Sequence, residues 1–212
     1  MGTSSLWNRG TVPHTDMNWQ LQNGVLQIGS GPAYWGVSGC STLDEKHMVL
    51  TIPKAIADEG FKSVSLSCAS GEYSLGQLAC QSLNIDLASG RVQGEELDAK
   101  SLDLDVASGN VDLIGDFSKS VNMNVASGVV SVTDLDSCPA YTSIDIMSGQ
   151  ASLAIPQDSG FTANVDKISG SFNCDFNGMW DSKKDGLLVC GDGEKAMDIS
   201  MASGTVVLHS LK

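Results

Sequence analysis

The chain has 212 residues, of which 42% are apolar, 6% are aromatic and 23 are glycine. Its 25 acidic residues outnumber its 12 basic ones, and the formal net charge of −13 excludes ready binding to a nucleic acid or an anionic membrane surface. No apolar run approaches the length of a membrane-spanning helix, so we expect no direct membrane insertion of this chain.

Residues 1–50 hold three of the four tryptophans and show no clean repeat. These tryptophans are Trp7, Trp19 and Trp35. Asn18 to Ile28 is predicted to be a β-hairpin that turns at Asn23-Gly24, a dipeptide suited to a tight turn between antiparallel strands. A stack of repeats must cover its open end, so we interpret residues 1–50 as an aromatic-rich β cap. Aromatic surfaces also hold sugars and peptides, and that interpretation stays open.

The remainder of the chain is organised by a repeat. The dipeptide Ser-Gly, usually preceded by Ala, recurs at intervals of 19, 19, 19, 21, 21 and 34 residues. The glycines are Gly71, Gly90, Gly109, Gly128, Gly149, Gly170 and Gly204. We interpret them as structural corners, because a bend with positive φ, or a very close backbone approach, would recur at the same place.

Apolar and polar residues alternate on both sides of each corner. In the repeat around Gly109, for example, Leu104 and Val106 flank the polar Asp105, and Val111 and Leu113 follow. Each repeat therefore predicts a strand, a Ser-Gly corner and a second strand. Nineteen residues at ~3.3 Å each cover roughly 63 Å, which suits one coil but is too short for a strand-helix-strand unit.

The predicted fold class is thus all-β, a single-chain parallel β-helix, or β-solenoid, over residues 51–212. One coil has about 19 residues, and the general handedness of parallel connections predicts a right-handed coil. Helices are not expected. The 34-residue interval is predicted to hold a hairpin excursion around residues 172–191, where Cys174 and Cys190 are the best candidates for a disulfide. Lys167 occupies an otherwise apolar column and leaves the local register open.

Polar residues are predicted to form an outward column on successive coils. Its members are Asp86, Asp105, Asn124, Asp145 and Asp166, and a second column two residues earlier holds Asn84, Asp103, Asn122, Ser143 and Asn164. Stacked oxygens can bind calcium, which takes six to eight oxygen ligands. The alternative is a solvated face with amide ladders, which we favour because the calcium-binding nonapeptide of β-helices is missing. We expect no cofactor and no resident metal.

The repeated strand-Ala-Ser-Gly-strand units resemble those of a known family. Together with two Ile-Pro segments that are each followed by Gly-Phe, and the ending Gly191-x-Gly193 followed by Asp198 to Leu208, they are similar to the bacterial putative-adhesin family of β-strand-repeat domains. The resemblance covers residues 48 to 210. It implies a β-helix on the outer side of a bacterial cytoplasmic membrane, often joined to an N-terminal membrane segment that this sequence does not include. The family's function is unknown, and no catalytic or binding residue carries over.

Three functions remain open after these observations. The first is a non-catalytic binding or scaffold module of the cell envelope or cell surface, whose partner is a protein or a glycan. The second is a carbohydrate-active β-helix enzyme, although Arg9 and Arg91 are the only arginines and no set of clustered acid, base and nucleophile is evident. The third is a purely structural spacer for another domain.

Overall fold

The computed structural model describes residues 17–30, 49–57, 59–181 and 186–212. The chain divides into two compact units, Met1–Thr51 and Ile52–Lys212, and each is described by itself. The described residues are almost entirely strands and connections between them, which confirms the all-β prediction. One short helix, α1 (Lys54–Ala57), departs from it. This helix follows Pro53, whose carbonyl accepts hydrogen bonds from the N–H groups of Ile56 and Ala57 at 2.9 and 3.1 Å.

In the first unit, β1 (Met17–Gln22) pairs antiparallel with β2 (Val25–Ser30). The turn is made by Asn23 and Gly24, which have φ values of 53° and 77°. Two positive φ values in succession are typical of the tight turn that follows the twist of a hairpin. Trp7 and Trp35 lie outside the described residues, and the cap interpretation of residues 1–50 stays a prediction.

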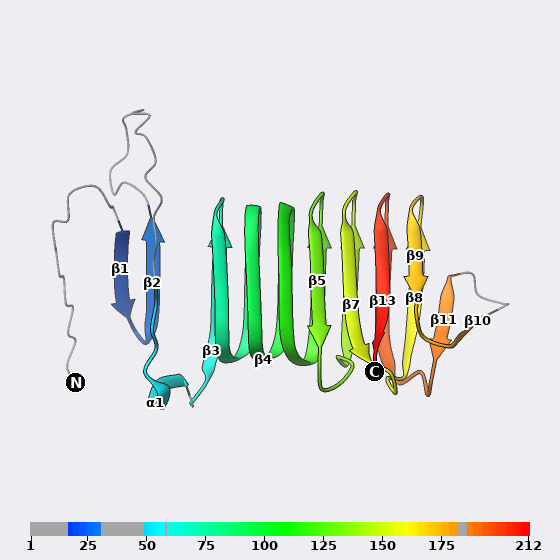
Figure 1. Cartoon of the computed structure of the whole chain (residues 1–212), viewed down its shortest axis with the longest axis horizontal. Helices are drawn as coiled ribbons and strands as arrows, with labels where there is room; N and C mark the ends of the chain where they lie inside the picture. The colour runs from blue at the N-terminus through cyan, green and yellow to red at the C-terminus, as the bar shows by residue number, and fades with distance from the viewer. Residues whose placement is uncertain (1–16, 31–48, 58, 182–185) are drawn as a thin grey trace. The chain divides into compact units, whose positions relative to one another are not determined.

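The second unit is a stack of strands wound as successive coils. The strands are β3 (Phe61–Cys68), β4 (Glu72–Val125), β5 (Val129–Asp134), β6 (Tyr141–Ile146), β7 (Gln150–Pro156), β8 (Phe161–Lys167), β9 (Ser171–Cys174), β10 (Gly178–Trp180), β11 (Leu187–Cys190), β12 (Lys195–Met201) and β13 (Thr205–Leu211). The 54 residues of β4 pass through more than two coils without an interruption of the strand pattern. Figure 1 shows the strands of this unit side by side.

The register of the parallel pairs follows the sequence repeat. Ser63 of β3 pairs with Ser82 of β4, and Asn110 of β4 pairs with Val129 of β5, so both pairs are 19 residues apart. In the next pairs, β4 with β6 and β5 with β7, the separation is 21 residues. The unit is therefore a β-solenoid-like repeat with a parallel-rich sheet, while its handedness stays a prediction.

The core lies between the strands and consists mainly of aliphatic side chains. The alternation expected around each corner is present: Leu104 and Val106 are buried, whereas Asp105 between them is exposed. Each fully buried aliphatic side chain contributes about 1.5–3 kcal/mol of hydrophobic free energy. Phe117 and Phe161 are the largest fully buried side chains.

The order of the coils departs from the order of the sequence at the C-terminal end. β12 pairs in parallel with both β6 and β8, and β13 pairs in parallel with both β7 and β9. The last coil of the chain is thus inserted between two coils that precede it in sequence, and Figure 1 shows β13 between β7 and β9.

Lys167 lies in a coil that this insertion leaves at the end of the parallel stack. Lys167 pairs with Met201 and occupies the column in which the other coils bury an apolar residue. Lys167 is exposed, as an unpaired charge of this kind must be where the apolar column ends. Met201, on the adjacent coil, is 2% exposed and belongs to the buried apolar column.

An antiparallel hairpin lies next to β8, at the end of the stack of parallel strands. β10 pairs with β11, and β11 pairs antiparallel with β8, which extends the sheet beyond the parallel coils. Cys174 and Cys190, the best candidates for a disulfide in the sequence, are free thiols. They are close enough for a thiol hydrogen bond to each other, and burial is the main cause that raises the pKa of Cys190 to about 11.

Candidate functional site

The seven corner glycines form one column, in the spatial order Gly71, Gly90, Gly109, Gly128, Gly149, Gly204 and Gly170. A Cβ atom on Gly109 would lie 2.8 Å from the backbone oxygen of Gly90, and one on Gly204 would lie 2.5 Å from that of Gly149. Both distances are too short for a real side chain. The column therefore lets consecutive corners stack closely, a structural role.

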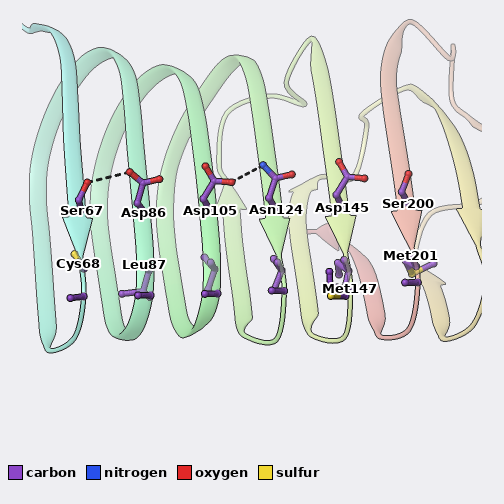
Figure 2. Close-up of a pocket in the computed structure, with 18 of the residues that line it drawn as sticks. Ser67, Cys68, Asp86, Leu87, Asp105, Asn124, Asp145, Met147, Ser200 and Met201 are labelled. Carbon is purple, nitrogen blue, oxygen red and sulfur yellow. Dashed lines mark hydrogen bonds between the residues drawn. The ribbon is translucent and has the colours of Figure 1, made fainter.

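A groove of about 970 Å³ runs along the coils beside these corners. Seven coils line it, and six of them contribute three successive residues, such as Asp105, Val106 and Ala107. The middle residue of each set is buried and forms the floor, while the residues on either side are exposed. Figure 2 shows the polar side chains in one row, with the apolar floor residues in a second row beneath them.

The polar row contains the acidic residues that the sequence had singled out. Its spatial order is Ser67, Asp86, Asp105, Asn124, Asp145, Ser200 and Asp166. Stacking in chain order would make Asp145 and Asp166 adjacent in the row. This expectation is wrong, because the inserted strand β12 places Ser200 between them. Ser200 cannot be assigned to this row from the sequence if the coils are assumed to stack in chain order.

Hydrogen bonds link some members of this row. Ser67 Oγ donates to Asp86 Oδ2 at 3.2 Å, and Asn124 Nδ2 donates to Asp105 Oδ1 at 2.9 Å. In the neighbouring column, Asn122 Nδ2 donates to Asp103 Oδ1 at 2.5 Å. These contacts are the rungs of a polar ladder between coils.

The polar ladder occupies oxygen atoms that a calcium ion would need as ligands. Two of the carboxylates in the row already accept hydrogen bonds from neighbouring coils. Within the described ranges, no group of three or more His, Cys, Asp or Glu side chains is arranged to hold a metal ion. The absence of tight calcium binding at this row stays a prediction.

The wall opposite the polar row is apolar. It consists of Ala69, Ala88, Ala107, Ala126, Met147, Ala202 and Ile168. Met147 and Ile168 are 66% and 88% exposed, so the wall presents two large apolar side chains to solvent. From the sequence alone, we interpret the recurrent alanine only as part of the corner. The period-two alternation was the available signal, because it places this alanine on the same outward face as the preceding aspartate.

One strongly perturbed carboxyl group lies apart from the groove. Asp134 is fully buried and accepts hydrogen bonds from the N–H groups of Phe117, at 3.2 Å, and Asp136, at 3.4 Å. Burial is the main cause that raises the pKa of Asp134 to about 6, partly opposed by these hydrogen bonds. Its contacts hold the turn after β5, so we assign it a structural role.

The comparisons with known proteins extend the sequence resemblance. No curated protein matches the chain. The crystal structure of a putative cell adhesion protein from Clostridium sporogenes is similar, with 12% sequence identity and a TM-score of 0.41, over 93% of this chain and 77% of that chain. Among the described residues, no helix has the length and apolar character needed to cross a membrane. The model of a family of unknown function, Toastrack DUF4097, matches residues 30–209, and the chain therefore belongs to the Toastrack DUF4097 family.

Proposed function

We propose that this domain is a non-catalytic binding module that holds an extended polymer, a protein segment or a glycan, along the groove. The observation that carries the proposal is the repetition of the lining, in which the same three positions recur on successive coils. Adjacent coils are about 4.8 Å apart, so the groove presents equivalent contacts at regular intervals. A repeating surface is complementary to a linear ligand that also repeats.

The composition of the groove argues against catalysis. Its lining, taken from the described residues, includes aspartates but no histidine, lysine or arginine. An enzyme that cleaves acidic polysaccharides generally gathers carboxylates and basic groups in one groove. We therefore propose a binding role in preference to a carbohydrate-active one.

The proposed location is outside the bacterial cytoplasmic membrane, in the cell envelope or at the cell surface. The support is the resemblance of the strand repeats to the putative-adhesin domains. The net charge of −13 makes nucleic acids and anionic lipids poor partners and favours a neutral or basic polymer.

The test is to block the groove. Ala107→Trp places a bulky ring on the apolar wall, and the matched control Asn110→Trp adds the same ring at an exposed position of β4 outside the groove. Fluorescence anisotropy would measure binding of labelled basic peptides, acidic peptides, neutral glycan chains and chitosan oligosaccharides to each protein. We expect at least one polymer to bind the native and control proteins and to lose at least tenfold in affinity with Ala107→Trp. If no polymer binds, or if both tryptophan variants bind equally well, the proposal is overturned and the spacer function is favoured.

A further inference from the structure

The carboxylates of the groove have a longer period than the coils. Asp105, Asp145 and Asp166 lie on every second coil of the stack, and the neutral Asn124 and Ser200 lie on the coils between them. With coils about 4.8 Å apart, these three carboxylates recur about every 9.6 Å. Asp86 adds a fourth carboxylate on the coil next to Asp105.

Each of these carboxylates is accompanied by an apolar side chain on the opposite wall. Two residues after Asp105, Asp145 and Asp166 come Ala107, Met147 and Ile168, all of which line the groove. The two largest, Met147 and Ile168, are well exposed to solvent. One unit of the groove, two coils long, therefore offers one negative charge and two apolar wall residues, such as Ala107 and Ala126 beside Asp105.

An extended ligand must have the same period to use every unit. Side chains on one face of a β-strand recur every ~6.7 Å, which falls out of register with a spacing of about 9.6 Å within one interval. A polyproline II helix has three residues per turn and rises about 3.1 Å per residue, so its equivalent side chains recur every ~9.3 Å. Across the two intervals from Asp105 to Asp166, the accumulated mismatch is only about 0.6 Å.

We propose that the groove binds a polyproline II segment of another protein that carries lysine or arginine at every third position. The basic side chains pair with Asp105, Asp145 and Asp166, and the proline rings pack on the apolar wall. Such a segment is already extended and loses little conformational freedom on binding. This inference rests on the proposed function, because it names the ligand of the same groove.

The charges supply register as well as attraction. An exposed ion pair contributes only about 0.2–1 kcal/mol, so one pair would not select a ligand. Three ion pairs can form together only with a ligand whose charges have the matching period, so such a ligand binds more tightly. Binding should also weaken as salt concentration rises, because the pairs are exposed.

The test uses the full chain and labelled twelve-residue peptides. (Lys-Pro-Pro)4 extends over about 37 Å, enough to follow all seven coils. The matched peptide has the same composition, with four consecutive lysines followed by eight prolines. We expect (Lys-Pro-Pro)4 to bind at least tenfold more tightly than the matched peptide.

Substitutions locate the contact. Asp105→Asn, Asp145→Asn and Asp166→Asn should each weaken (Lys-Pro-Pro)4 binding about threefold, and Asp112→Asn, an exposed control outside the groove, should leave it unchanged. Equal binding of the two peptides, or binding of (Lys-Pro-Pro)4 that Ala107→Trp does not reduce, overturns the inference. If a glycan chain occupies the groove, shown by its sensitivity to Ala107→Trp, while (Lys-Pro-Pro)4 does not bind, the inference fails but the proposed function stands. If no polymer binds, both fail.

Discussion

The corner glycines show how a single hydrogen atom in place of a side chain sets the spacing of the coils. Gly71 and Gly90 have φ values of 114° and 107°, a region that glycine adopts without strain. Gly109 does not have a positive φ, yet a Cβ atom at this position would lie only 2.8 Å from the backbone oxygen of Gly90. Close backbone approach is therefore the requirement common to every glycine of the column except Gly71 at its end, and positive φ is an additional one at some corners.

Gly109→Ala tests this requirement. The new Cβ would lie 2.8 Å from both the backbone oxygen of Gly90 and Cγ of Leu87, so the stacked coils must shift apart. We expect a loss of about 1–3 kcal/mol in the free energy of unfolding, the usual cost of overpacking. Asn110→Ala, at the adjacent exposed position, should change it by less than about 0.5 kcal/mol. Urea unfolding of both variants makes the comparison, and equal midpoints would show that crowding does not govern the corner.

Among the elements, local periodicity predicted the strands well where the repeat is regular. The residues around Leu104 and Val106 lie in a strand with the predicted buried face, and the same holds after the corner for Val111 and Leu113. Periodicity did not predict the order of the last coils. Each coil offers a similar apolar face to either neighbour, so alternation along a strand does not specify which coils are adjacent.

Cysteine crosslinking tests the inserted coil. Asp145 and Ser200 are paired in adjacent parallel strands, about 4.8 Å apart, within the range of Cα distances that a disulfide spans. Asp145 and Asp166 are two coils apart, at about 9.6 Å, beyond that range. We expect Asp145→Cys with Ser200→Cys to crosslink on mild oxidation, and Asp145→Cys with Asp166→Cys to remain reduced, as measured by mass spectrometry after proteolysis. The variants that carry only one of these substitutions give the background from the six native cysteines, and the reverse pattern would mean that the coils stack in chain order.

For the whole molecule, the sequence predicted the architecture better than the site. The repeat established the coils and placed the aspartates on one outward face, because both follow from alternation along a strand. Alternation also places Ala107 and its equivalents on this face, but it does not show that they form one wall of a groove. The two-coil period of the carboxylates could not be predicted, because it arises only when Ser200 enters the row between Asp145 and Asp166.

Charge and burial together predict how the stability of the whole molecule depends on pH. The folded protein holds the Asp134 carboxyl with a pKa of about 6, chiefly because of burial, against an ordinary value of 3.8. The folded state therefore binds this proton more tightly than the unfolded state, and the resulting stabilisation is complete below pH ~4 and is lost as the pH rises through about 6. Between pH 5 and pH 8 the loss from this group is about 1 kcal/mol. Burial and the nearby charges of Asp136 and Asp98 also raise the pKa of Asp116, so that group acts in the same direction.

We accordingly expect the urea midpoint of the native protein to be higher at pH 5 than at pH 8, with an added contribution from the self-repulsion of a chain whose formal net charge is −13 at pH 7. Asp134→Asn keeps an acceptor for the N–H of Phe117 but cannot ionise, so it should remove about 1 kcal/mol of this difference. Asp112→Asn removes an equal charge at an exposed position and should leave nearly all of the difference in place. Urea titrations of the three proteins at both pH values make the measurement. A native midpoint that rises from pH 5 to pH 8, or the same pH response in both variants, would show that the buried carboxyl does not control the pH dependence.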